Sequence, residues 1–435
     1  MFLLTSIASV PASAQGEDKL KPIWFETWGG KKSEGDVRGI TVDEKNGDIY
    51  LVGYTHSFGG QDVFLLKYNA RDGNLEKWKT WSADEHYGKS SYSNPHSVVF
   101  YDDHVYVAGA TGCGSGSEAF LLKYDSDSEL KDSIVFEKRS KAFAVVAYND
   151  YIYVTGHNWN NADINPDVAL WCFDLDFNKL WCKTWDGSAG GDDYGTTLVE
   201  YQGYLYISGT TQLIGSHGRL THDVVLLKYD ANNPDSELIF IDSWGTNEWD
   251  EAKGIVAYQN HLYITGLTQN YDNVYDIFLL KYDTLDSGWD WCKIWEETNY
   301  DENVGYGIAI GDNHIFVAGY VCKYSPSQIV LTVVLKYDLD GNLKWSKTWH
   351  PNVISQSAAG GRILAYDNCL YVGGHCTVIG KSTDAFLLKC NYNGGGGKSK
   401  SAHPALFNTI IMKFLENHPL IYQILQRFFL NLLAF

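Results

Sequence analysis

Short apolar segments alternate with polar turns along most of this chain, and the segments recur in one fixed order. An apolar strand of the form Tyr/Phe-x-x-Gly appears seven times, with its glycine at Gly53, Gly109, Gly156, Gly209, Gly266, Gly319 and Gly374. A second strand of the form Asp-x-x-Leu-Leu-Lys-Tyr follows, as in residues 62–68, 223–229 and 276–282. A period of about 50 residues with several strands per period is typical of a propeller or a solenoid.

One repeat predicts four strands. Residues 253–258 form a short apolar strand, residues 259–260 a tight turn, and residues 261–267 an alternating strand. Residues 276–283 and 290–295 supply the third and fourth strands, and the fourth carries paired tryptophans that fit the wedge between neighbouring blades. Four short strands joined by turns indicate an antiparallel blade.

The two ends of the repeat region predict how the ring closes. The seventh repeat stops after its third strand, residues 384–390, and residues 23–28 (IWFETW) match the fourth-strand segment 344–349 (KWSKTW). We therefore expect the N-terminal strand to complete the last blade. The predicted fold is an all-β, seven-bladed β-propeller of four-stranded antiparallel blades over residues 23–392, closed so that few strand edges stay exposed.

These motifs resemble a bacterial and archaeal β-propeller repeat family often called SBBP. Its pattern W-x-x-T-x-G-G, G-I-x-V-D, G-x-I-Y-V-x-G-x-T and D-x-F-x-x-K-Y is followed by residues 24–30, 39–43, 47–55 and 62–68. The resemblance covers about residues 23–392. It implies a propeller and a secreted or cell-surface setting, and it implies no reaction and no catalytic residues.

Both termini differ in character from the repeats. Residues 1–14 resemble a secretory signal peptide, with an apolar stretch and an Ala-x-Ala site at residues 12–14, although no Lys or Arg precedes it. We expect export, and a true start that differs from Met1. Residues 393–404 read as a Gly/Ser/Lys linker, and residues 405–435 as a hydrophobic helical tail. Lys413, Glu416 and Arg427 disfavour a membrane span, so the tail is expected to contact a partner protein, a membrane surface or the propeller.

Charge and motifs narrow the classes of function. The net charge of −19, from 53 acidic and 34 basic residues, repels phosphate backbones and makes nucleic acid an unsuitable partner. None of the eight cysteines stands in a C-x-x-C pair, so no zinc site is predicted. No cofactor is predicted, although the acidic turns are compatible with calcium.

The repeat also separates scaffold from site, because a residue present in every blade is expected to serve folding. By this criterion Asp62, Asp167, Asp223, Asp276 and Asp384 are structural. The variable loops after the second strands and between blades lie on one face, where binding sites form on a rigid scaffold. The candidate ligand-binding residues on that face are Trp159, Asp192, Asp193, Trp249, Asp250, Tyr271, Tyr300, Asp301, His157 and His375.

Three functions fit these observations. The first is a non-enzymatic, secreted or cell-surface module that binds protein or carbohydrate through the long-loop face. The second is a polysaccharide hydrolase or lyase that uses acidic residues near the central channel. The third is a structural surface-layer component anchored by the tail. We expect a cluster of buried acids beside a histidine in the channel for an enzyme, and a polar face with scattered aromatic side chains for a binding module.

Overall fold

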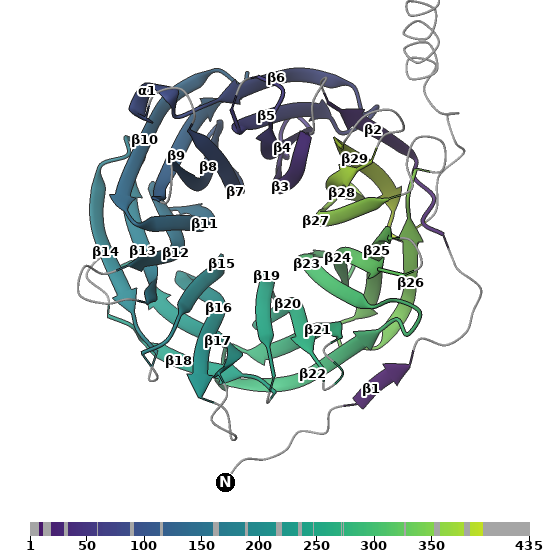
Figure 1. Ribbon diagram of the computed structural model, residues 1–435. Coiled ribbons are helices and arrows are strands. Elements are labelled where there is room, and N and C mark those ends of the chain that lie inside the picture. The colour runs from purple at the N-terminus through teal and green to yellow at the C-terminus, as the bar shows by residue number, and fades with distance from the viewer. Residues whose placement is uncertain are drawn as a thin grey trace, which may run out of the picture.

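The computed structural model is an all-β protein whose sheets stand around a common centre, as in a β-propeller (Figure 1). It describes residues 8–11, 19–29, 34–58, 60–87, 91–113, 116–159, 165–187, 190–214, 220–233, 237–246, 248–270, 272, 274–325, 328–351, 357–377 and 383–394. The predicted linker and tail lie outside these residues, apart from Asn393 and Gly394. Within the described part of the chain, no helix has the length and apolar character needed to cross a membrane.

Four of the sheets are antiparallel and are each built from four consecutive strands. The first contains β3 (Glu34–Asp43), β4 (Asp48–Thr55), β5 (Asp62–Asn69) and β6 (Leu75–Trp81). The second contains β7 (Tyr92–Tyr101), β8 (His104–Gly112), β9 (Glu118–Asp125) and β10 (Leu130–Lys138), and the short helix α1 (Asp84–Tyr87) precedes it. The third contains β11 (Ser140–Tyr148), β12 (Tyr151–Trp159), β13 (Pro166–Asp174) and β14 (Lys179–Trp185). The fourth contains β15 (Asp193–Tyr201), β16 (Tyr204–Ile214), β17 (Leu220–Asp230) and β18 (Phe240–Trp244).

A nine-stranded sheet combines the next two repeats. The earlier repeat supplies β19 (Asp250–Tyr258), β20 (His261–Gln269), β21 (Tyr275–Asp283) and β22 (Gly288–Glu296). The later repeat supplies β23 (Glu302–Gly311), β24 (His314–Lys323), β25 (Ile329–Asp338) and β26 (Leu343–Trp349). A single parallel pair, Tyr275 with Glu302, joins the two antiparallel runs. The N-terminal strand β1 (Ala8–Pro11) pairs in parallel with β22 and adds the ninth strand.

The last sheet contains both ends of the repeat region. Strands β27 (Ala358–Tyr366), β28 (Cys369–Cys376) and β29 (Asp384–Asn391) come from the C-terminal repeat, and β2 (Trp24–Trp28) pairs antiparallel with β29. The register places Trp24 opposite Lys389 and Trp28 opposite Ala385. The pairing that the sequence predicted for residues 23–28 is therefore present.

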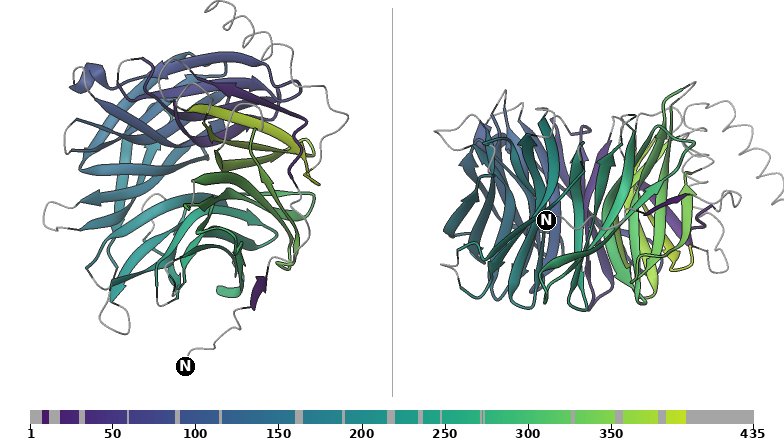
Figure 2. Two further views of the ribbon diagram at one scale, coloured as in Figure 1. Left: turned by 45° about the vertical axis from the view of Figure 1, so that its right-hand side comes forward. Right: turned by 90° about the horizontal axis from the view of Figure 1, so that it is seen from below.

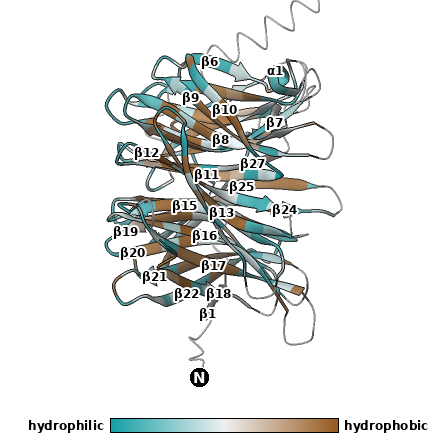
Figure 3. Ribbon diagram, turned by 90° about the vertical axis from the view of Figure 1, so that its left-hand side faces the viewer, coloured by the Kyte–Doolittle hydropathy of each residue, from teal (hydrophilic) through white to brown (hydrophobic). Residues whose placement is uncertain are grey.

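The apolar core lies between neighbouring sheets. Figure 2 shows the strands from the side, and the hydropathy colouring of Figure 3 shows hydrophobic residues along the strands and hydrophilic residues at many of the turns. One cluster joins buried residues of β12 and β13 to those of β16 and β17, with Trp181 and Trp185 packed against it. Trp24 and Trp28 pack in the same way between the last sheet and the first. The paired tryptophans thus occupy the wedges between sheets, as the sequence predicted.

The recurring glycine creates a β-bulge in the innermost strand of each repeat. Gly319 lies opposite Gly305, and the register of β23 shifts immediately afterwards, so that Tyr306 has no partner on β24. A Cβ atom on Gly319 would stand 1.8 Å from the carbonyl oxygen of Val304. Only glycine allows this approach of the two backbones. Because a bulge redirects a side chain, the glycine turns the bulged residue toward the centre of the molecule.

Candidate functional site: the central channel

The bulge recurs in all seven innermost strands, opposite the seven repeat glycines. The side chains at or directly after it line a common cavity, and unlike the glycines they differ from strand to strand. They are Arg38, His96, Phe143, Thr196, Lys253, Tyr306 and Arg362. We call them the channel ring.

The channel ring separates two compartments of the cavity. The lower compartment, of about 220 Å³, is otherwise lined by small residues and by aliphatic side chains such as Ile255 and Ile308. The upper compartment, of about 390 Å³, adds Lys141, Tyr194 and Glu251 from the starts of innermost strands, and His157 and Trp159 from the end of β12. The long loops leave the sheets at these strand ends, so the upper compartment belongs to the face on which the sequence predicted binding.

A buried histidine stands among aromatic rings in the upper compartment. The ring of His157 lies 4.5 Å from that of Trp159, 5.0 Å from that of Tyr194 and 5.2 Å from that of Phe143, measured between centroids. His157 is 2% exposed, and neither ring nitrogen has a hydrogen-bond partner within the described residues. Burial, with Lys141 nearby, lowers the pKa of His157 to about 3, so the ring is neutral. An unpaired buried polar group costs about 1–3 kcal/mol, which a ligand or water could recover.

Cations outnumber acids around the cavity. Lys253 Nζ lies 2.8 Å from a carboxylate oxygen of Glu251. Asp36 Oδ1 lies 3.0 Å from Nδ1 of His375, and Arg38 Nε is 3.8 Å from Asp36 Oδ2. Burial pushes the pKa of Asp36 upward, but His375 and Arg38 outweigh it and hold that pKa below its ordinary value. The carboxylates of Asp36 and Glu251 therefore already face cationic or hydrogen-bonding groups.

Four sequence-predicted residues belong to this site or adjoin it. His157 and Trp159 line the upper compartment. Asp192 accepts a hydrogen bond of 2.8 Å from the hydroxyl of Tyr194 and so orients a lining ring. His375 adjoins the cavity through its contact with Asp36.

Asp193 and Asp250 have a different role from the one predicted. Both are fully buried. Asp193 accepts a hydrogen bond from the backbone N–H of Gly187, at 2.7 Å, and Asp250 accepts from the backbone N–H and the hydroxyl of Thr246. These carboxylates fix the connections between sheets, because buried backbone donors need an acceptor. They present no surface to a ligand.

Three more of the predicted residues are described by the structure and are absent from the cavity lining. Trp249 stacks on His222 with 3.8 Å between ring centroids. Tyr300 packs against the apolar cluster between β21 and β25. Asp301 accepts a hydrogen bond from the backbone N–H of Tyr324, at 2.7 Å. Tyr271 lies outside the described residues.

The channel ring itself was missed from the sequence. Its signal was present, because one position in the repeated motif changes character in each copy: Arg38 before Gly-Ile, Lys253 before Gly-Ile and Tyr306 before Gly-Ile. Variable residues in loops are expected to bind ligands, but this variable position lies within a strand, where such a role is not expected. A bulge turns that position inward, and alternation of side chains along a regular strand does not reveal it.

Four of the five recurring aspartates are buried, as expected of scaffold, and the fifth, Asp223, is partly buried. Asp276 accepts hydrogen bonds from the side-chain amides of Asn303 and Asn270, at 3.2 and 3.3 Å. Burial raises the pKa of Asp223 and of Asp276 to about 6.

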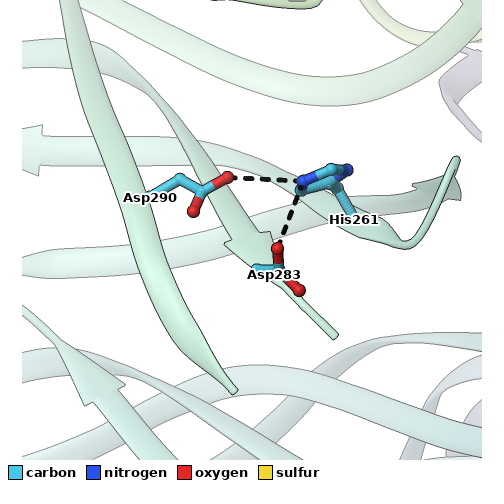
Figure 4. Close-up of side chains that lie close together, drawn as sticks. All are labelled: His261, Asp283 and Asp290. Carbon is cyan, nitrogen blue, oxygen red and sulfur yellow. Dashed lines mark ion pairs between the residues drawn. The ribbon is translucent and has the colours of Figure 1, made fainter. Parts of the chain in front are cut away.

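Within the described residues, one group of potential metal ligands comes together outside the channel. His261 Nε2 lies 3.6 Å from Asp283 and 3.4 Å from Asp290 (Figure 4). Lys281 Nζ is 3.3 Å from the same oxygen of Asp290 and already supplies a positive charge. Calcium takes about six to eight oxygen ligands. Two carboxylates beside an ammonium group do not fit that ion.

Comparisons with known proteins give a fold-level likeness only. No family model matches the chain, and no curated protein matches it. Among solved structures, YjhT is 14% identical, with 67% of this chain and 93% of that chain covered and a TM-score of 0.40. The β-propeller domain of the Trilobed protease from Pyrococcus furiosus is 8% identical, with coverage of 83% and 96% and a TM-score of 0.45. A proposed 6-phosphogluconolactonase from Bacteroides uniformis is 13% identical, with coverage of 72% and 84% and a TM-score of 0.46.

Proposed function

We propose that the protein is a non-enzymatic binding module, exported from the cell, that holds a glycan or a protein side chain in the upper compartment of its channel. The observation that carries the proposal is His157, a buried histidine in a cavity with aromatic walls, whose two ring nitrogens have no hydrogen-bond partner among the residues that the structure describes. Ligand sites are concave and largely apolar, with a few polar groups that set orientation. The volume of about 390 Å³ is in the range of such sites.

The scaffold for this site is, in our proposal, a closed ring of seven blades. The two antiparallel runs of the nine-stranded sheet count as separate blades, because one residue pair joins them. The pairing of β2 with β29 supplies the closing strand. Deletion of residues 19–29 should lower the thermal unfolding midpoint and promote association through the freed edge of β29, as measured by calorimetry and light scattering. An unchanged midpoint would contradict closure by β2.

Binding is tested with the full chain on an array of neutral and acidic oligosaccharides and of peptides. Trp159→Ala removes a wall of the upper compartment and should weaken binding of any captured ligand about tenfold or more. Trp249→Ala is the matched control, because Trp249 is 40% exposed and lies outside the cavity lining. Equal loss in both variants, or loss in Trp249→Ala alone, would place the site on the outer loops and contradict the proposal.

A polysaccharide hydrolase or lyase is the second candidate, favoured by the contact between Asp36 and His375 beside the channel. A histidine oriented by a carboxylate can transfer protons. The candidate ranks second because Asp36 and Glu251, the acids nearest the channel ring, already face cations. Release of reducing or unsaturated ends from polysaccharides, lost in His375→Gln and retained in His261→Gln, would support the enzyme.

Anchoring of a surface-layer component by residues 405–435 also stays a proposal. Deletion of residues 393–435 should then release the protein from the cell surface into the medium, as detected by immunoblotting of both fractions. Unchanged retention would exclude the anchor.

A further inference from the structure

The charge of the channel opposes the charge of the protein. Arg38, Lys141, Lys253 and Arg362 line the upper compartment, whereas Glu251 is the lining carboxylate. The whole chain carries −19. An excess of positive side chains inside a low-dielectric wall focuses a positive field on the ligand. The upper compartment is therefore an attractive place for an anion in an otherwise repulsive molecule.

Two of these cations converge on one aromatic ring. The guanidinium carbon of Arg362 lies 5.7 Å from the centroid of the Tyr306 ring, and Lys253 Nζ lies 5.9 Å from it. Arg362 Nε donates a hydrogen bond of 2.7 Å to the carbonyl oxygen of Arg38, which holds the guanidinium in place. Tyr306 therefore lies beside two cations, and the backbone hydrogen bond orients the guanidinium of Arg362.

Arg362 is the less neutralised of the two. Glu251 contacts Lys253, and Asp36 contacts Arg38 and His375, but within the described residues no carboxylate forms an ion pair with Arg362. Burial lowers the pKa of Arg362, and the negative charge of Asp36 opposes that shift. A guanidinium presents a planar fork of donors that matches a carboxylate or another oxyanion.

The other polar groups of the compartment are neutral donors and acceptors. Burial lowers the pKa of His157 and of His96, and nearby cations lower it further. Both rings contact Phe143, at 5.2 and 5.0 Å between centroids. The compartment thus combines a cationic region at Arg362 with aromatic faces and an unpaired imidazole, groups that suit the C–H face and the hydroxyls of a sugar.

We propose that the upper compartment binds an acidic sugar, with its anionic group at Arg362 and Lys253 over Tyr306 and its ring against Phe143 and Trp159. The inference rests on the proposed function and narrows its ligand class. The anionic group is an oxyanion: a carboxylate, as in a uronic acid, or a sulfate ester. Both offer oxygens to the guanidinium fork, so experiment has to distinguish them.

Isothermal titration calorimetry of the full chain tests the proposal with four probes: an oligogalacturonate, a sulfated galactose oligosaccharide, its unsulfated counterpart and a polyglutamate peptide. At least one acidic saccharide should bind about tenfold or more tightly than the neutral one, and added NaCl should weaken that binding. Comparison of the two acidic probes identifies the anionic group. Arg362→Gln and Lys253→Gln should each weaken binding about tenfold or more, because a charge-assisted hydrogen bond is lost.

Arg71→Gln is the control, because Arg71 is an exposed arginine on the turn between β5 and β6. It should leave affinity unchanged. Arg362 donates a hydrogen bond to a backbone carbonyl, so the thermal unfolding midpoint of the Arg362→Gln variant is measured as well. Lys253→Gln keeps the test decisive if Arg362→Gln fails to fold. Equal affinity for neutral and acidic saccharides, or tightest binding of polyglutamate, would overturn the inference and leave a binding module. The absence of binding to every probe, with none captured on the array, would overturn both.

Discussion

The two compartments of the channel share one ring of side chains and differ in everything else. In the lower compartment a small residue followed by Ile or Val recurs in four of the innermost strands, as in Gly254-Ile255 and Gly307-Ile308. The upper compartment is assembled from residues found in single repeats, such as His157, Trp159 and Tyr194. Residues that recur in the repeats therefore serve packing even where they line a cavity. The polar and aromatic groups that could contact a ligand lie at positions of the upper compartment that differ between repeats.

The largest loss of stability is expected where alanine replaces a glycine that creates a bulge and so places the channel ring. Gly319→Ala should lower the free energy of unfolding by about 3 kcal/mol or more, because its Cβ would stand 1.8 Å from the backbone oxygen of Val304. Gly288→Ala is the control, since a Cβ there meets nothing within 4 Å. Urea unfolding followed by tryptophan fluorescence measures both. A loss of less than about 1 kcal/mol in Gly319→Ala would show that the bulge does not depend on glycine.

Two alanine substitutions, one in the lower compartment and one in the channel ring, should have opposite effects on stability and on ligand affinity. Ile308→Ala, in the lower compartment, should cost about 2 kcal/mol of stability, because Ile308 is 9% exposed and packs with the cluster between β21 and β25. Phe143→Ala, in the ring, should cost about 1 kcal/mol or less, because Phe143 is only partly buried. Ligand affinity should change the other way round, with about a tenfold loss in Phe143→Ala and none in Ile308→Ala. The same pattern in both variants would remove the distinction between the compartments.

The smallest effect concerns the recurring aspartates and depends on pH. Burial raises the pKa of Asp223 from 3.8 to about 6, so the folded protein binds this proton more tightly than the unfolded chain. The stability from this group is therefore fully present below about pH 4 and is lost as the pH rises through about 6. Asp223→Asn should be more stable than the native protein by about 1 kcal/mol at pH 7, after allowance for partial exposure. Unfolding midpoints at pH 4 and pH 7 measure the difference, which should disappear at pH 4.

The repeat made the architecture predictable, because strand boundaries follow from alternation and turn residues. The partner of residues 23–28 could also be read from the missing strand of the last repeat. The site could be read only in part. His157 and Trp159 lie at a strand end next to a variable loop, and variable loops on a rigid scaffold are where binding residues are expected. Asp250 carries the same kind of signal and is buried at a turn, because sequence does not show whether a carboxylate faces solvent or a backbone N–H. Arg362 was missed because a bulge, unlike a regular strand, changes which side chain faces inward.

The pairing of β2 with β29 also has a consequence in time. Residues 24–28 leave the ribosome early, and their partner, residues 385–389, follows about 360 residues later. At a synthesis rate of about 5–20 residues per second, β29 is made roughly 20–70 seconds after β2. The four sheets that are built from four consecutive strands can form during synthesis. Among the described strand pairings, that of β2 with β29 joins the segments that lie farthest apart in the sequence, so we expect it to form most slowly. Residues 24–28 therefore stay without this partner through most of the synthesis of the repeats.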